Sequence, residues 1–141
     1  MGNPRPIGIT SDEIDLSRRF LETHAVAASP TAGTITTIAT LTITSDVVVT
    51  KGIFLEAFAA YTVGTNGVSG LLEIRQTNTT GTLIGATGAL TVVATNLVSA
   101  SVQGIDTGPT LTGQVYVVCL TVGSGSAGST VSAVSLFATI V

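Results

Sequence analysis

Few side chains in this sequence could carry out chemistry, and they lie far apart along the chain. The 141 residues include one cysteine, Cys119, and one histidine, His24. Catalysis usually needs several titratable groups held together, and a metal site needs several ligands of these types. Cys119 lies in the apolar run Val117–Leu120, which predicts a small buried side chain rather than a reactive thiol. We therefore expect no catalytic residue, no metal site and no bound cofactor.

Two short motifs match patterns that carry chemistry, and both are better explained as loops. The run Gly123–Gly128 has the glycine spacing of a dinucleotide-binding loop. Such a loop must open a helix, whereas a β-branched segment follows here. The run Asp106–Gly108 resembles the catalytic triplet of aspartic proteases, but Pro109 follows it late in the chain. A polar turn is the preferred interpretation. The sequence thus predicts a protein that is not an enzyme.

Charge and hydropathy exclude several classes of partner. Charged residues make up 9% of the chain, against about 25% in typical soluble domains. A net charge of −3 with five basic residues leaves no basic surface for nucleic acid. Mean hydropathy is +0.63, yet no run approaches the ~18 unbroken apolar residues of a membrane helix. We expect neither nucleic acid nor a membrane as a partner.

Residues 1–33 are expected to form a polar connector arm. Seven of the thirteen charged residues fall within the first 22 positions. Thr10 and Glu13 fit a capping box, which predicts a short helix over about residues 11–22. The alternative is an extended arm over 16–26, added as a strand to a neighbouring subunit. In either form, five apolar side chains would link one subunit to the next: Ile9, Ile14, Leu16, Phe20 and Leu21.

Residues 34–141 are expected to form one β domain. Apolar and polar residues alternate with period 2 in segment after segment, and no helical pattern interrupts them. Turn signals stand at 64–67, where Asn-Gly predicts a hairpin, at 78–81 and at 106–109. The expected strands are 35–44, 53–63, 68–76, 82–87, 89–95, 97–103, 114–122 and 130–141. The fold predicted is all-β, an antiparallel jelly-roll sandwich of about eight strands.

The strands of this domain have few charges on the face that would meet water. Threonine, serine and alanine stand where soluble sheets usually place lysine and glutamate. Long uncharged strands tend to associate, so much of this surface is expected to be covered by copies of the chain. A monomer kept soluble by its hydroxyl groups is the alternative. Glu73 and Arg75 share one side of a strand and could pair with Glu56 or Lys51 across the sheet, or lie at the rim of a subunit interface.

Four segments resemble a pattern of bacterial jelly rolls of the tumour-necrosis-factor/C1q type: Leu71–Arg75, Thr82–Gly85, Gly113–Tyr116 and Val131–Ala138. The composition of residues 34–141 is also similar to the C-terminal domains of exosporium glycoproteins and to endospore appendage subunits of Bacillus. The resemblance implies trimers. It does not extend to a collagen-like repeat or to arm cysteines, which this chain lacks.

These observations predict a non-enzymatic structural protein that self-assembles through its body and arm. The first interpretation is a trimer or ring that builds a filament on a spore or cell surface. No secretory signal is expected at the N-terminus, and release by lysis suits both a spore and a phage. The alternative is a phage capsid decoration or minor capsid protein in the virion. A further alternative is a carbohydrate- or receptor-binding module that uses Tyr61, Tyr116 and Asp106. The expected partners are copies of the chain and an anchor protein of a capsid or spore surface.

Overall fold

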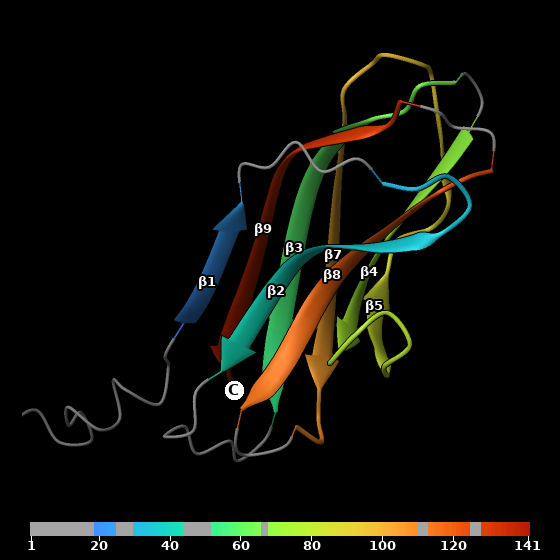
Figure 1. The fold of residues 1–141 in the computed structure, drawn as a ribbon. Helices are drawn as coiled ribbons and strands as arrows, with labels where there is room; N and C mark the ends of the chain where they lie inside the picture. The colour runs from blue at the N-terminus through green and yellow to red at the C-terminus, as the bar shows by residue number, and fades with distance from the viewer. Residues whose placement is uncertain (1–18, 25–29, 44–51, 66–67, 110–112, 125–127) are drawn as a thin grey trace, which may run out of the picture.

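The period-2 pattern produces two antiparallel β-sheets that pack face to face (Figure 1). The computed structural model describes residues 19–24, 30–43, 52–65, 68–109, 113–124 and 128–141. Sheet A has the order β1 (Arg19–His24), β9 (Thr130–Ile140), β3 (Ile53–Thr62) and β7 (Val98–Asp106). Sheet B has the order β2 (Ile35–Ile43), β8 (Gln114–Val122), β4 (Val68–Gln76) and β5 (Leu83–Ala86), with β6 (Leu90–Val92) also paired to β4.

The path of the chain through these sheets is that of a jelly roll. The two short strands β5 and β6 pair with opposite ends of β4, so they share one position at the edge of sheet B. The nine strands of the described residues therefore occupy eight positions in two four-position sheets. The prediction of an all-β, eight-stranded antiparallel sandwich is confirmed. The expected strands match the observed ones closely, because the alternation that predicts a strand also determines which residues face the core.

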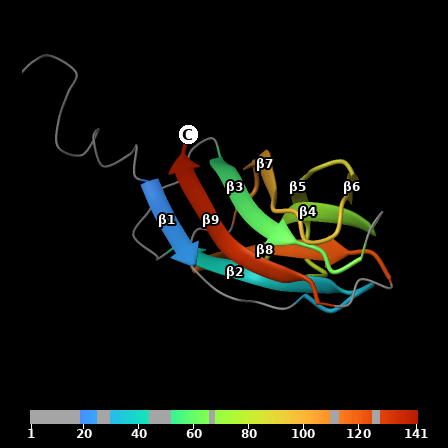
Figure 2. The ribbon, with the colours of Figure 1, turned by 90° about the horizontal axis from the view of Figure 1, so that it is seen from above.

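The core lies between the two sheets and is formed by every second residue of the long strands. Its largest fully buried side chains are Tyr61, Tyr116, Ile53, Leu55, Leu72, Ile74, Leu120 and Leu136. Figure 2 shows the two layers from above, with β1 over β2 at one side and β7 close to β5 at the other. At the β5–β7 side, Gly85 and Gly104 allow the backbones to approach. A Cβ atom on either glycine would meet a backbone oxygen of the opposite strand.

The N-terminal region differs from the helix that its capping box predicts. Residues 19–24 form strand β1, which pairs antiparallel with β9 at the edge of sheet A. The prediction of a helix over 11–22 is therefore wrong at residues 19–22. Residues 11–18 lie outside the described part of the chain. The extended alternative is correct at residues 19–24, but the strand adds to the sheet of its own chain. It also lies N-terminal to residue 34, the expected start of the β domain.

The expected hairpin at 64–67 is the second difference. The segment joins β3 of sheet A to β4 of sheet B, and these strands are not hydrogen-bonded to each other. It is a crossover between sheets, and residues 66 and 67 are outside the described residues. The turn expected at 78–81 is present, and it joins β4 to β5 as a true hairpin. Asn78 Oδ1 accepts the backbone N–H of Thr80 at 2.9 Å and its hydroxyl at 2.8 Å. Among the described residues, no helix is long and apolar enough to cross a membrane.

Candidate functional site

The outer face of sheet A exposes a group of large apolar side chains. Because residues alternate in β3, Phe54 and Phe58 point away from the core that Ile53 and Leu55 enter. The register places Ile105 of β7 beside Phe54, and it places Phe137 of β9 beside Glu56. We call Phe54, Phe58, Ile105 and Phe137 the apolar patch. Three of the four phenylalanines in the sequence belong to it.

Two of the four side chains of the apolar patch are exposed to solvent. Phe58 is 39% exposed and Ile105 is 54% exposed, whereas Phe54 and Phe137 are half-buried. A contiguous apolar surface with aromatic residues is typical of a protein–protein contact. Burial of apolar surface against a partner is favourable by about 25 cal/mol for each Å² that is removed from water. The patch is therefore the candidate functional site of the described structure, as an interface.

One carboxylate stands within the apolar patch. Glu56 is the only charged residue among the outward-facing positions of β3, β7 and β9. Its Oε1 atom accepts a hydrogen bond from Gln103 Nε2 at 3.0 Å. Beside it lies a hollow of about 140 Å³ lined by Phe54, Glu56, Phe137 and Thr139. The hollow thus combines two aromatic walls with a half-buried acidic group, which favours an apolar ligand group next to a cation.

The outer face of sheet B has a different character. Thr37, Thr40 and Thr42 are exposed along β2. On β4, Arg75 Nη2 donates to Glu73 Oε1 at 3.0 Å, and its Nε donates to Oε2 at 3.3 Å. The hydrogen bond with Glu73 is the main cause that raises the pKa of Arg75. This pair is already satisfied within its own strand, so it offers little to a partner.

The structure corrects the expected partners of this pair. Glu56 lies on the outer face of the other sheet, so it cannot pair with Glu73 or Arg75 across a shared sheet. Arg75 Nη1 instead donates to the backbone oxygen of Gly81 at 3.0 Å. Lys51 lies outside the described residues.

Asp106 forms a polar connection between the sheets rather than a catalytic group. It ends β7, and its Oδ1 accepts the backbone N–H of Gly108 at 3.0 Å, which confirms the expected turn. Its Oδ2 accepts hydrogen bonds from Tyr116 Oη at 2.7 Å and from Gln76 Nε2 at 2.5 Å, both in sheet B. Burial raises the pKa of Tyr116, and the hydrogen bond to Asp106 and its charge raise it further. The carboxylate is thus fully engaged in holding the sheets together.

The residues expected for a carbohydrate site are not at the surface. Tyr61 and Tyr116 are fully buried and Asp106 is 4% exposed. The interpretation of these three residues as a sugar-binding site is therefore wrong. No group of three or more histidine, cysteine, aspartate or glutamate side chains in the described part of the chain could hold a metal ion. The run Gly123–Gly128 leads into strand β9, and residues 125–127 lie outside the description.

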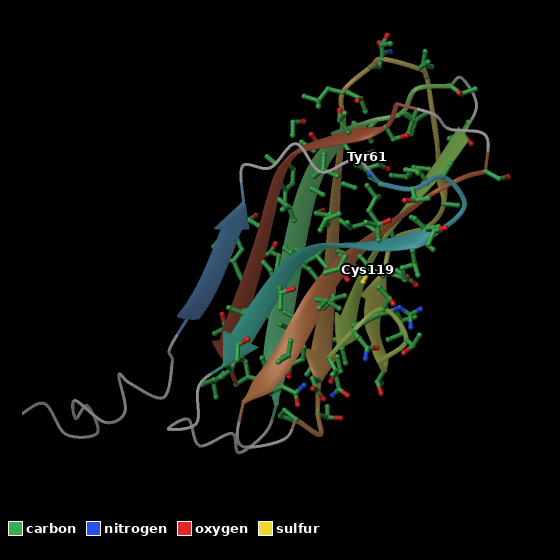
Figure 3. The ribbon with its side chains drawn as sticks, viewed as in Figure 1. Tyr61 and Cys119 are labelled. Atoms are coloured by element: carbon green, nitrogen blue, oxygen red, sulfur yellow. The ribbon has the colours of Figure 1, made fainter. Side chains whose placement is uncertain are left out.

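Cys119 is buried, as its apolar neighbours predict. It lies near the middle of β8 (Figure 3), and burial is the main cause that raises the pKa of its thiol. A neutral, enclosed thiol is a poor nucleophile. We expect no reaction of the folded protein with a disulfide reagent at pH 8, and reaction of one thiol per chain in urea. The Thr40→Cys variant is the positive control, since Thr40 is exposed on β2 and pairs in register with Val117 rather than with Cys119. Rapid reaction of the folded wild type would contradict this expectation.

The subunit-linking residues proposed from the sequence are only partly within the described structure. Phe20 and Leu21 lie in β1, opposite Ala138 and Phe137 of β9. Leu21 thus holds a register position next to a member of the apolar patch. Ile9, Ile14 and Leu16 lie outside the described residues.

Sequence reasoning missed the apolar patch and a second apolar surface at one end of the sandwich. Leu90, Val93 and Leu97 are all exposed within one short segment around β6. The patch had a partial signal, because Phe54, Glu56 and Phe58 alternate with the core residues of the same strand, but both faces of that strand carry apolar residues. The second surface had none, since its residues follow no regular spacing.

The fold places this protein in the class of jelly-roll β-sandwiches, and a comparison with solved structures supports this class. No protein-family model and no curated protein sequence matches the chain. The chain is similar in structure to a chain from the solved structure of infectious bursal disease virus, Gx strain. The TM-score is 0.60 with 14% sequence identity. The match covers 99% of this chain but 37% of the viral chain, so this protein spans well under half the length of that one. At this identity the likeness concerns the fold.

Proposed function

We propose that this chain is a non-enzymatic structural protein of a virus particle, a capsid decoration or minor capsid protein that assembles from copies of itself. The observation that carries this proposal is the exposed apolar patch on one sheet of a jelly roll. Jelly rolls are widely used as capsid domains. The likeness to a chain of infectious bursal disease virus over 99% of this chain supports that setting. A virion is accordingly the proposed location.

The distribution of paired polar groups and exposed apolar groups on the surface supports self-association. Most polar groups described here are already paired, as in the Glu73–Arg75 and Asp106–Tyr116 contacts. Exposed apolar side chains gather on the outer face of sheet A, where Phe58 and Ile105 lie, and in the segment around β6. Contacts between copies would therefore depend on apolar burial, because exposed ion pairs contribute only about 0–1 kcal/mol each. The proposed assembly is trimer-based, and its further partner is a capsid surface.

The test compares the purified protein in two variants. Phe58→Ser with Ile105→Ser should shift the sedimentation of a discrete trimer toward the monomer. The matched control is Leu83→Ser with Leu90→Ser, which removes two exposed leucines from sheet B and should leave the oligomer intact. Unchanged sedimentation of the first variant would overturn the role of the patch. Spontaneous growth of fibres from the wild-type protein would favour the filament on a spore surface over the capsid protein.

The subunit-linking residues expected in the N-terminal region, two of which lie in β1, allow a second prediction about assembly. Phe20→Ala with Leu21→Ala should weaken subunit linkage at least tenfold more than Arg18→Ala with Arg19→Ala, because apolar burial and not charge is expected to dominate. Assembly should also survive molar salt and a thiol reductant, since Cys119 is buried and ion pairs are few. Sedimentation measures the assembled fraction, and circular dichroism checks that each variant retains its sheets. Dissociation by salt or by reductant would contradict this account.

A further inference from the structure

We propose that the hollow beside Glu56 is the acceptor site for residues 1–18 of a second copy of the chain. This inference rests on the proposed self-assembly and names the contact that would produce it. The occupant is an arm segment, and the acceptor is formed by Phe54, Glu56, Phe137 and Thr139. Three observations support this occupant. Residue 19 pairs with Thr139 at the hollow, residues 1–18 contain aliphatic and arginine side chains, and the described partner of Glu56 is a neutral amide.

The arm leaves the body beside the acceptor. Strand β1 begins at Arg19, which pairs in register with Thr139 at the edge of sheet A. Thr139 lines the hollow. The 18 residues that precede β1 can therefore extend from the acceptor of one copy to that of an adjoining copy. Fully extended, a segment of that length spans up to about 60 Å. That is longer than the ~35 Å of an eleven-residue strand such as β9, so the arm can reach beyond its own sheet.

The chemistry of the arm complements that of the hollow. Residues 1–18 contain four large aliphatic side chains, Ile7, Ile9, Ile14 and Leu16, two arginines, Arg5 and Arg18, and three carboxylates, Asp12, Glu13 and Asp15. The hollow has two phenylalanine walls and one carboxylate, whose described partner is the neutral amide of Gln103. An aliphatic side chain would cover the aromatic rings. An arginine would give Glu56 a charged donor, and such hydrogen bonds are about twice as strong as neutral ones.

An arm held by the next copy also explains how the contact can build an assembly. The arm of one copy and the hollow of another form a heterologous contact, which closes into a ring or continues along a lattice. Each copy then both donates an arm and accepts one. The competing occupant is the arm of the same chain, which would fill the hollow without linking subunits. The experiment below separates the two.

The experiment uses two full-length variants, each with one added cysteine, that are mixed after purification. Ile14→Cys places a thiol in the arm, and Thr139→Cys places one at the hollow. Mild oxidation of the mixture should give a disulfide-linked heterodimer, seen on a non-reducing gel as at least fivefold more dimer than either variant gives when oxidised alone. Ser99→Cys is the matched control, because Ser99 is exposed on the same outer face but lies at the opposite end of β7 from Ile105. We expect at least fivefold less heterodimer with this control. Wild-type protein, whose Cys119 is buried, should give none.

A charge reversal at the acceptor provides an independent measurement. Glu56→Lys on the Thr139→Cys background should reduce the heterodimer yield at least fivefold, because Arg5 or Arg18 is proposed to meet Glu56. A higher yield would place the acidic side chains of Asp12, Glu13 and Asp15 there instead and would contradict this pairing. Glu56 is half-buried on the outer face and does not enter the core, so the fold should persist, and circular dichroism verifies that it does.

The possible failures point to different conclusions. If the protein sediments as an oligomer but no heterodimer forms, the arm inference is overturned and the proposed function stands. If the double variant Ile14→Cys/Thr139→Cys forms only an intramolecular disulfide, the arm occupies the hollow of its own chain, and the exchange is likewise overturned. If the wild type is a monomer at every concentration, the proposed function itself fails.

Discussion

Replacing Asp106 by alanine should lower the free energy of unfolding by about 3–4 kcal/mol, because hydrogen bonds to a charged group contribute about 1.5–3 kcal/mol each. The carboxylate accepts hydrogen bonds from Tyr116 Oη, from Gln76 Nε2 and from the backbone of Gly108. Tyr116 is fully buried, so its hydroxyl would lose its acceptor inside the protein, which costs free energy. Two of these donors belong to sheet B, whereas Asp106 belongs to sheet A. The substitution would therefore loosen the connection between the two layers.

Urea denaturation followed by circular dichroism measures this effect. Asp106→Asn retains an acceptor oxygen but turns an amide donor toward another donor, so it should lose an intermediate amount, about 1–2 kcal/mol. Thr107→Ala, at the exposed neighbouring position, is the control and should change stability by less than ~0.5 kcal/mol. A loss below 1 kcal/mol for Asp106→Ala, on the scale of a single neutral hydrogen bond, would show that the contact does not hold the sheets together.

The strands themselves could be predicted from the sequence because their signal is local. In β2 and β3 every second residue enters the core, and this alternation is visible without knowledge of the partner strand. The pairing of the strands has no such local signal. β3 pairs with β9 and not with β4, the next strand along the chain. The Asn-Gly at 66–67 therefore suggested a hairpin, although the chain there crosses between sheets.

The N-terminal region illustrates competition between local and tertiary interactions. The capping box at Thr10 and Glu13 is a local helix signal. Residues 19–24, however, can pair along their whole length with the free edge of β9. A short helix is marginal unless it packs on a surface, whereas an edge strand satisfies its backbone hydrogen bonds on one side at once. The edge strand prevails at residues 19–22.

The candidate interface could not be located from the sequence for a related reason. Phe54 and Phe137 are distant in sequence, and only the β3–β9 register brings them to one face. Both faces of β3 carry apolar residues, so the alternation alone does not show that Phe54 and Phe58 face solvent. The composition predicts covered surfaces, and the structure places exposed apolar side chains on the outer face of sheet A and around β6.

Replacing Gly70 by alanine should lower the free energy of unfolding by about 3 kcal/mol, at the upper end of the cost of overpacking a core. A Cβ atom at Gly70 would overlap Tyr61 Oη and would lie 2.8 Å from Cζ and 2.9 Å from Cε2 of the same ring. Tyr61 is fully buried near one end of the sandwich (Figure 3), so the ring has little room to move. The backbone of Gly70 does not have a positive φ. The loss would therefore come from the ring alone.

Tyr61→Phe tests that origin, since it removes the atom nearest to the new methyl group. The Tyr61 hydroxyl is buried and has no hydrogen-bond partner among the described residues, and burial raises its pKa. Its removal alone should be neutral or stabilise the protein by about 1 kcal/mol, because an unsatisfied buried group costs free energy. In the double variant Tyr61→Phe/Gly70→Ala, the loss should fall well below the sum of the single effects, with a coupling of about 1 kcal/mol or more. The double variant would not regain the full stability, because Cζ and Cε2 of the ring would still be close to the new methyl group. Urea denaturation of all four proteins measures this coupling, and strict additivity would place the cost of Gly70→Ala elsewhere than at Tyr61.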